Sequence, residues 1–424
     1  MPRPEHSISR ADISGGALKV LYTLKKAGFE AYLVGGGVRD LLLGREPKDF
    51  DVVTDAEPEE VKRLFRSARL IGRRFRLAHV RFGPEIIEVA TFRGAVEDVD
   101  EQNRLSVDGR IVRDNVYGTT VEEDVWRRDF SINGLYYDIR DFSVLDYTGG
   151  MADLQAGVLR IIGDPVRRYR EDPVRMLRAV RFAAKLGFRL GDETAAAIPE
   201  CAPMLADIPP ARLYEEVLKL FLGGVAAQSF ELLNHFDLFK YLFSESAACF
   251  NENPMAPPAQ LVLRAMANTD TRIQEDKPVT PSFLFAALLW PAVHKDTVSH
   301  GERGLTPIQA MDAAGMDVIE RQVSQVSVPR RFSLVAREIW SLQARLEQRR
   351  GKRATQLLGR PRFRAAYDFL LLRAESGEDV AEMADWWTKF QEMDESGRKA
   401  ASDGVGPRRR RRRRGRRGQT QAET

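Results

Sequence analysis

The spacing of hydrophobic and polar positions divides the chain into a mixed first part and a helical second part. Before residue 163, short apolar runs predict strands at 32–34, 49–51, 69–71, 77–82, 86–91, 144–147 and 159–161, with helices at 14–26, 39–43 and 57–65. Beyond that residue, apolar positions at helical spacing predict helices at 173–186, 211–222, 227–236, 258–268, 281–289, 307–320, 335–347, 362–374 and 383–391. The pattern indicates an α+β protein with a small mixed head and an all-α remainder.

The helix predicted at 173–186 carries two separate stripes. The apolar stripe comprises Val174, Leu177, Val180 and Ala184, and the basic stripe comprises Arg175, Arg178, Arg181 and Lys185. A basic stripe is most often a solvated face. This one follows Glu171 and Asp172 at the junction of the two parts, where ligand clefts are favoured, so both interpretations stay open.

Three stretches lack apolar periodicity. Residues 1–12 are expected to form a disordered lead, and the acidic residues 94–123 a mobile flap, because long loops are usually functional or disordered. Order is expected to end near residue 393, since the residues beyond it are poor in apolar side chains and rich in charge.

Charge is concentrated in this C-terminal stretch. The formal net charge is +4, but without the tail arginines the chain sums to −5. Such a run is a polyanion-binding tail, a localisation signal or a solubilising appendage, and the permanent charge of arginine favours nucleic acid. The arginines concerned are Arg408, Arg409, Arg410, Arg411, Arg412, Arg413, Arg414, Arg416 and Arg417.

Composition limits the class of protein. The 424 residues are 43% apolar, which suffices for the cores of two to four domains. Cys201 and Cys249 show no metal-ligand spacing, as expected in a reducing cytosol. The N-terminus has no apolar core, and the longest apolar run, 283–293, is too short to span a bilayer. A cytoplasmic protein without a transmembrane segment is expected.

The candidate chemistry lies in residues 32–55, YLVGGGVRDLLLGREPKDFDVVTD. Glycines between a strand and a helix let phosphate oxygens approach backbone N–H groups and the positive helix end. Asp49 and Asp51 are two apart in a strand and share one face, with Phe50 buried on the other. Two carboxylates this close repel unless a cation lies between them, and Mg²⁺ accepts carboxylates together with substrate phosphates. The stretch predicts a site for a nucleoside triphosphate.

Each of these motifs has an ordinary alternative. A lone triple glycine is usually a flexible turn, and a lone Asp-x-Asp pair a solvated strand edge, but their joint strand–glycine–helix–strand order favours function. Glu88 is either an extra acidic group near the metals or, more commonly for such a residue, an exposed strand charge. Arg127, Arg128 and Asp129 form either a surface ion pair or a site where arginines contact a triphosphate.

These motifs resemble the nucleotidyltransferase fold shared with DNA polymerase beta, and within it the class II nucleotidyltransferases, which include bacterial poly(A) polymerases and tRNA CCA-adding enzymes. The segments that carry the resemblance are LVGGGVRDLLLG with DFDVVT, RRDFSINGLYYD, REDPVRMLRAVRFAAKLGF and ARLYEE. Residues 72–94, 281–290 and 351–375 and the arginine tail look like a bacterial poly(A) polymerase rather than a CCA-adding enzyme.

The resemblance implies a polymerase-beta-like nucleotidyltransferase head followed by an all-α neck, body and leg and a basic tail. The expected segments are a disordered lead at 1–12, the head at 13–163, a helical neck with the nucleotide-recognition motif at 164–225, a helical RNA-binding body at 226–393 and a disordered arginine-rich tail at 394–424.

The resemblance also implies roles for individual residues. Asp49 and Asp51 would hold two Mg²⁺ ions, and Asp129 matches the third acidic position of the catalytic set. Binding of ATP is implied for Gly36, Gly37, Arg39, Arg128, Asp172, Arg175 and Arg178, of which the last three would recognise the base. The tail arginines would bind RNA.

The implied reaction is template-independent polyadenylation, in which an RNA 3′-hydroxyl attacks the α-phosphorus of ATP and pyrophosphate leaves. RNA 3′ ends and ATP are the implied partners; RNA-decay or RNA-chaperone proteins are further partners that the residues do not specify. One alternative is a tRNA CCA-adding enzyme, with the same chemistry and a different product. Another is a catalytically silent RNA-binding adaptor, against which the intact Asp49, Asp51 and Asp129 argue.

Overall fold

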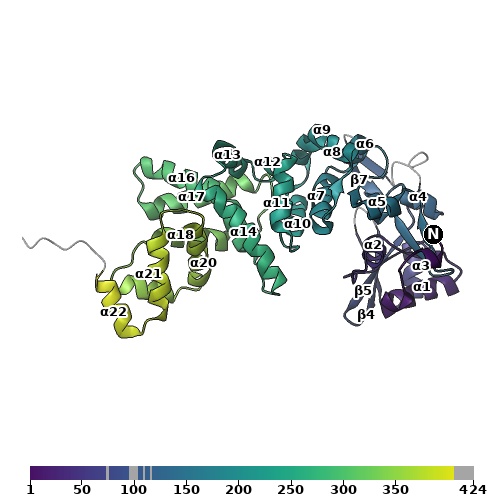
Figure 1. The fold of residues 1–424 in the computed structure, drawn as a ribbon, viewed down its shortest axis with the longest axis horizontal. Helices are drawn as coiled ribbons and strands as arrows, with labels where there is room; N and C mark the ends of the chain where they lie inside the picture. Colours follow the sequence, from purple (N-terminus) through teal and green to yellow (C-terminus); the bar gives the residue numbers. More distant parts are fainter. Residues whose placement is uncertain (73–75, 95–103, 108–109, 115–116, 405–424) are drawn as a thin grey trace, which may run out of the picture. The chain divides into compact units, whose positions relative to one another are not determined.

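The computed structural model describes residues 1–72, 76–94, 104–107, 110–114 and 117–404 (Figure 1). They form two compact units. The first comprises Met1–Ala247, Met266–Val279 and Gln322–Val328, and the second comprises Ala248–Ala265, Thr280–Arg321 and the chain from Pro329 onward. Among these residues no helix is long and apolar enough to cross a membrane.

A seven-stranded mixed sheet organises the first unit, in the order β3-β4-β5-β2-β1-β8-β9. Its strands are β1 (Ala31–Val34), β2 (Asp51–Thr54), β3 (Ala68–Ile71), β4 (Leu77–Phe82), β5 (Glu85–Thr91), β8 (Leu135–Asp138) and β9 (Val144–Asp146). All neighbouring pairs are antiparallel except β2 and β5, which are parallel. The mixed sheet confirms the predicted α+β head.

The strand register aligns one row of residues across this sheet. Arg69 pairs with His79, which pairs with Glu88. Glu88 in turn pairs with Asp51, and Asp51 with Val34. Side chains aligned across neighbouring strands point to the same face of a sheet, so these five residues, called the central row below, share one face.

The opposite face of the sheet is covered by α1 (Gly15–Lys26) and α3 (Pro58–Leu64) (Figure 1). The Ser14 side chain accepts a hydrogen bond from the backbone N–H of Ala17 and caps α1, as predicted. The side chains of β4 and β5 on this face are apolar and buried: Ala78, Val80, Ile87 and Val89. Because α1 and α3 cover this face, the central row lies on the other face of the sheet, where a functional site can form.

The remaining elements of the first unit connect the sheet to a helical segment. They are α2 (Gly36–Leu42), β6 (Arg104–Val107), β7 (Arg110–Asp114), α4 (Val121–Val125), α5 (Gly150–Ala156), β10 (Val158–Leu159), α6 (Pro165–Glu171), α7 (Val174–Leu186), β11 (Arg189–Leu190), α8 (Asp192–Ala196), α9 (Ile198–Cys201), α10 (Pro210–Phe221), α11 (Ala226–His235) and α12 (Phe239–Leu242). The 3₁₀ helices are η1 (Arg3–Glu5), η2 (Arg10–Asp12), η3 (Ser131–Asn133) and η4 (Ala202–Asp207). The predicted strand at 159–161 is displaced, since β10 pairs with β11 in a separate small sheet.

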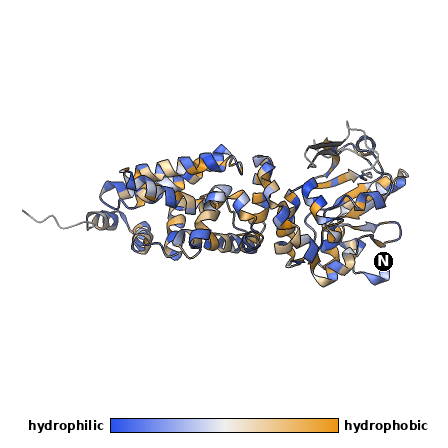
Figure 2. Ribbon diagram, turned by 90° about the horizontal axis from the view of Figure 1, so that it is seen from above, coloured by the Kyte–Doolittle hydropathy of each residue, from blue (hydrophilic) through white to orange (hydrophobic). Residues whose placement is uncertain are grey.

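The second unit is helical. Its helices are α15 (Pro281–Leu288), α16 (Trp290–Glu302), α18 (Arg330–Leu346), α19 (Lys352–Leu358), α20 (Phe363–Glu375), α21 (Ala381–Glu392) and α22 (Glu395–Gly404). Three further helices, α13 (Ser244–Glu252), α14 (Pro257–Gln274) and α17 (Pro307–Gln322), contribute residues to both units. In Figure 2 the helices carry hydrophobic and hydrophilic colours in alternation, as expected for amphipathic helices. Trp387 is fully buried and donates to the Leu346 carbonyl at 2.9 Å, which places it in the core of this unit.

Three expectations about irregular structure are wrong. The lead at 1–12 is tied to the sheet, because the Met1 amino group donates to the Val144 carbonyl at 2.8 Å and the side chain of Ile8 is buried. The flap expected at 94–123 contains the antiparallel hairpin of β6 and β7 and the helix α4. Order does not end near Met393, since α22 follows it. The lead is held by partners distant in the sequence, whereas α4 and α22 begin at side-chain caps from Thr120 and Asp394. The tail arginines lie outside the described residues.

We expect Gly150→Ala to destabilise the first unit by about 1–3 kcal/mol. A Cβ at Gly150 would lie 2.3 Å from the carbonyl oxygen of Ser131, a backbone atom that cannot move aside easily. Gly15→Ala is the matched control, because a Cβ there meets no atom within 4 Å. Urea unfolding of both variants measures the effect, and equal midpoints would contradict it.

Candidate active site

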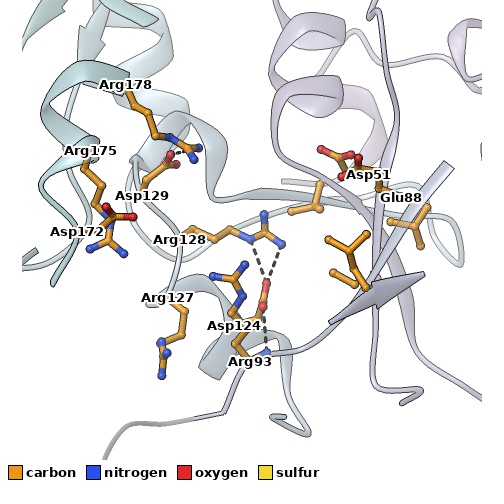
Figure 3. Close-up of a pocket in the computed structure, with 14 residues that line it drawn as sticks. Asp51, Glu88, Arg93, Asp124, Arg127, Arg128, Asp129, Asp172, Arg175 and Arg178 are labelled. Atoms are coloured by element: carbon orange, nitrogen blue, oxygen red, sulfur yellow. Dashed lines mark hydrogen bonds and ion pairs between the residues drawn. The ribbon is translucent and has the colours of Figure 1, made fainter. Parts of the chain in front are cut away.

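A pocket in the first unit lies where β2 and β5, the segment 124–129 and the start of α7 meet (Figure 3). Six of the ten site residues predicted before the tail line it: Asp51, Arg128, Asp129, Asp172, Arg175 and Arg178. Asp49, Gly36, Gly37 and Arg39 are not among its lining residues. Residues far apart in the sequence are therefore brought together here as predicted.

Carboxylates gather at the sheet side of the pocket. Burial first, and then the charge of Glu88, raise the pKa of Asp51 from its ordinary value of 3.8 to about 6, with Arg128 opposing and Asp49 adding to the rise. Phe50 is buried between the two aspartates as predicted, although β2 begins only at Asp51 and Asp49 lies before it. Glu88 lines the pocket and its side chain is 53% exposed, so the structure shows the expected exposed strand charge at a place close to Asp51, and a role of Glu88 at the metals stays a prediction.

These acidic groups fit a divalent cation by their chemistry. Carboxylate oxygens are the donors that Mg²⁺ prefers, and the pKa of Asp51 is raised first by burial and then by the negative charge of Glu88, both of which a bound cation would offset. Within the described part of the chain, however, no three His, Cys, Asp or Glu side chains are already close enough together to hold a metal ion.

The glycine turn lies directly against Asp51 and Arg128. Gly35 precedes α2 with φ of 73°, a conformation that favours glycine. A Cβ on Gly35 would lie 3.7 Å from Oδ2 of Asp51 and 3.9 Å from Nη1 of Arg128. Gly36 and Gly37 follow as the first residues of α2. The turn thus forms one wall between a carboxylate and a guanidinium.

Arg39 is held inside the protein. Its side chain is 2% exposed and donates to Oδ1 of Asn133 at 2.7 Å and to Oδ1 of Asp40 at 2.7 Å. It also lies over the ring of Phe182, 5.5 Å from the centroid. In this arrangement Arg39 ties α2 to η3.

Arg128 points into the pocket from a fixed position. Its guanidinium donates to Oδ2 of Asp124 at 2.8 Å and to the Tyr136 hydroxyl at 2.6 Å. Burial lowers the pKa of Arg128, but Asp124 and Tyr136 raise it further, so the net shift is upward and the group stays charged. Burial raises the pKa of Asp124, and the outweighing charges of Arg128 and Arg93 bring it below its ordinary value. Sequence reasoning missed Asp124, although acid and base four residues apart in a helical stretch signal such a pair.

Asp129 is paired with a residue of α7. Nη2 of Arg178 lies 2.5 Å from Oδ2 of Asp129, and the other carboxylate oxygen accepts from the backbone N–H of Phe130 at 2.8 Å. Burial raises the pKa of Asp129, but Arg178 and the Asn133 side chain outweigh this and lower it. Its negative charge is thereby balanced within the protein, unlike that of Asp51. Its role as the third acidic position stays a prediction.

The wall formed by α6 and α7 is held by buried ion pairs. Arg168 donates to Oε2 of Glu171 at 2.6 Å and to the carbonyls of Arg127 and Arg128 at 3.1 and 2.5 Å. Burial and then the charge of Arg175 lower the pKa of Arg168 to about 10. Arg175 shares Oε2 of Glu171 at 3.1 Å. The end of α6 is therefore bonded to the turn that carries Arg128.

Asp172 is oriented from a second helix. Arg212 of α10, a residue that sequence reasoning missed, donates to its Oδ2 at 2.7 Å. Arg175 and Arg178 also line the pocket, while the Arg178 side chain is 41% exposed, so a ligand-binding role for these two members of the basic stripe stays a prediction.

Known proteins and family models match this chain along most of its length. The family described as "Poly A polymerase head domain" matches residues 31–160, "Probable RNA and SrmB- binding site of polymerase A" matches 187–250, and "Polymerase A arginine-rich C-terminus" matches 303–419. Poly(A) polymerase I of Escherichia coli O6:H1 is 53% identical over 397 residues, which cover 92% of this chain and 85% of the relative. The chain belongs to the poly(A) polymerase family. Poly(A) polymerase I of Salmonella typhi is 51% identical over 421 residues, 97% of this chain and 90% of the relative.

CCA-adding enzymes are more distant relatives of this poly(A) polymerase family member. The CCA-adding enzyme of Lactobacillus helveticus is 39% identical over 223 residues, 52% of this chain and 53% of that enzyme. The solved structure of the Thermotoga maritima CCA-adding enzyme complexed with tRNA has a TM-score of 0.59 at 20% identity and covers 95% of this chain and 88% of its own, which shows the shared fold. The predicted family, fold and enzyme class, a polynucleotide adenylyltransferase, are confirmed.

We expect Asp51→Asn to stabilise the metal-free protein at pH 8 by up to about 3 kcal/mol. The folded-state pKa of Asp51 is raised to about 6, so ionisation opposes folding. Stability is fully present below the unfolded pKa near 4 and is lost as pH rises to about 6. The variant should therefore match the wild type at pH 4 and exceed it at pH 8 in thermal unfolding. Asp192→Asn is the control, since that side chain is 99% exposed. An equal gain in stability of Asp51→Asn at pH 4 and pH 8 would contradict the raised pKa of Asp51.

Proposed function

We propose that this poly(A) polymerase family member adds adenylate from ATP to RNA 3′ ends without a template, releasing pyrophosphate. The observation that carries the proposal is the opposition, within one pocket, of the carboxylates Asp51 and Glu88 to the guanidiniums of Arg128, Arg175 and Arg178. Such a pocket suits a metal-bound triphosphate, and the chain's membership of the family supports an RNA acceptor. The added tails mark RNA for processing or decay.

We propose Asp49 and Asp51 as the holders of two Mg²⁺ ions, with Asp129 as the third acidic position and Glu88 as a further carboxylate beside Asp51. When bound, Mg²⁺ would lower the pKa of the attacking 3′-hydroxyl and neutralise charge on the pyrophosphate that leaves. Glu88 is a candidate because it pairs in register with Asp51, and it raises the pKa of that group. Asp129 would also hold Arg178 in place through their ion pair.

We propose that the nucleotide lies between the glycine turn and the wall of α7. The backbone of Gly36 and Gly37 and the guanidinium of Arg128 would contact phosphates, and Arg39 would support the turn from inside. Adenine presents an amino donor and ring-nitrogen acceptors, which a carboxylate and a guanidinium complement. Asp172, with Arg175 and Arg178, would supply these groups.

The side chains of the protein position the substrates and stabilise the charge that develops in the transition state. They form no covalent intermediate. Arg128 is already held by Asp124 and Tyr136, so its charge needs no rearrangement when the α-phosphorus is attacked. We place the activity in the cytoplasm, which the two free cysteines support.

Incubation of the purified protein with Mg²⁺, a 5′-labelled RNA and each nucleoside triphosphate alone tests the function. We expect long tails with ATP only. Addition that stops after C, C and A would indicate a CCA-adding enzyme, and absence of all incorporation an adaptor. Asp51→Ala should lower the rate by at least about 1,000-fold, because the metals supply several kcal/mol of charge stabilisation. Asp192→Ala, at an exposed site, should retain wild-type activity.

Deletion of residues 408–424 should weaken RNA binding and flatten its salt dependence, by about 0.7 in the log–log slope for each phosphate that the tail no longer neutralises. The rate at saturating RNA should be unchanged, since the pocket is intact. Fluorescence anisotropy over a range of salt concentrations measures this. A slope equal to that of the full chain would count against the tail as an RNA-binding segment.

A further inference from the structure

An open face of the sheet continues outward from the pocket over β5, β4 and β3. Its residues alternate with the buried ones that face α1 and α3, as the two faces of a strand require. The face carries Arg69 and Ile71 on β3, His79 and Arg81 on β4, and Ile86 and Glu88 on β5. Leu77, Glu88 and Ala90 belong both to this face and to the pocket lining. The face is thus an extension of the active site.

Two apolar side chains lie exposed on it. Ile71 is 39% exposed and Ile86 is 40% exposed, on strands that lie two apart in the sheet. Ile71 aligns with Leu77 and Ala90, whereas Ile86 lies four residues before Ala90 on β5, so the two provide separate apolar contacts against which a sugar or base can pack.

Two positive side chains border the same face. Arg69 and Arg81 are exposed, and neither guanidinium forms an ion pair or hydrogen bond with another residue that the structure describes. Arg69 lies in the central row, two strand spacings, or about 10 Å, from Glu88. Between them His79 contacts Glu88, with Nε2 3.1 Å from Oε1. Charge along the row therefore changes from positive at Arg69 to negative at Glu88 and Asp51.

The direction from which the acceptor approaches follows from the proposed function, on which this inference rests. Arg128, the proposed phosphate contact, is bonded to Tyr136 of β8, on the β1–β8 side of Asp51. In phosphoryl transfer the attacking and leaving oxygens lie on opposite sides of the phosphorus. A pyrophosphate that leaves towards Arg128 requires the 3′-hydroxyl to arrive from the other side, over Glu88 and β5.

We infer that the face of β3, β4 and β5 holds the 3′-terminal nucleotides of the RNA acceptor. Arg69 and Arg81 contact phosphates of the incoming strand, and Ile71 and Ile86 pack against its riboses or bases. Exposed guanidiniums beside apolar side chains favour a polyanion over a protein partner. The acceptor is held through its backbone and through stacking.

The double variant R69E/R81E tests this in the full-length protein with a four-nucleotide oligoadenylate acceptor, because a short acceptor limits the share of binding that distant basic segments contribute. We expect the KM for the acceptor to rise at least tenfold and the KM for ATP to stay within twofold. The log–log salt slope of the acceptor KM should fall by about 1.4, for two phosphate contacts on a single strand.

The double variant K62E/R66E is the matched control. Lys62 and Arg66 are exposed at the end of α3, on the covered side of the sheet, and the variant has the same charge change. I71S/I86S should raise the acceptor KM without changing the salt slope. An acceptor KM in R69E/R81E within twofold of the control would overturn the inference and leave the face to a protein partner.

Photocrosslinking gives a readout that needs no turnover. An RNA with 4-thiouridine in its last two positions should crosslink the wild-type protein within residues 69–90, and crosslinks confined to other segments would overturn the inference. If the wild type adds no adenylate to any acceptor, the proposed function fails, while the crosslink still decides where the 3′ end lies.

Discussion

The parallel pairing of β2 with β5 places two carboxylates, Asp51 and Glu88, side by side at the centre of the sheet. Backbone hydrogen bonds maintain this arrangement against the repulsion of the two groups, and burial together with this repulsion raises the pKa of Asp51. A protein can keep such strain only where the surrounding structure is over-determined. Here the apolar face under α1 and α3 supplies that support, so the core of the head serves to hold like charges together.

In the opposite wall of the pocket, charged groups are paired with groups of opposite charge. Each guanidinium that faces the carboxylates is paired with an acid: Arg128 with Asp124, Arg178 with Asp129, and Arg175 with Glu171, which it shares with Arg168. These pairs fix the direction of each positive group before any ligand arrives, and this preorganisation is the main electrostatic contribution that a protein makes to phosphoryl transfer. Asp51, a buried carboxylate with a like-charged neighbour, thus faces guanidiniums that are already paired, across one pocket.

Local patterns in the sequence predicted the parts of the site that are local in the chain. The spacing of Asp49 and Asp51 around a buried Phe50, and the stripes of α7, are read directly from neighbouring positions. The partners Asp124 and Arg212, and the place of Glu88, depend on strand register and on helix packing, which no short window contains. The ordered lead at residues 1–12 escaped prediction for a similar reason, since Ile8 and the Met1 amino group find their partners about 140 residues away or in the assembled core.

The hydrogen bonds of the buried Arg168 side chain join two segments of the pocket wall. One guanidinium bonds Glu171 at the end of α6 and also the carbonyls of Arg127 and Arg128. Separating these segments would leave a buried charge without partners, at a cost of several kcal/mol. The end of α6 and the turn that carries Arg128 are therefore coupled. With the base against Asp172 and the phosphates against Arg128, as proposed above, a poorly fitting base would also disturb the phosphate contacts, and selection among nucleotides would act on the reaction rate as well as on binding.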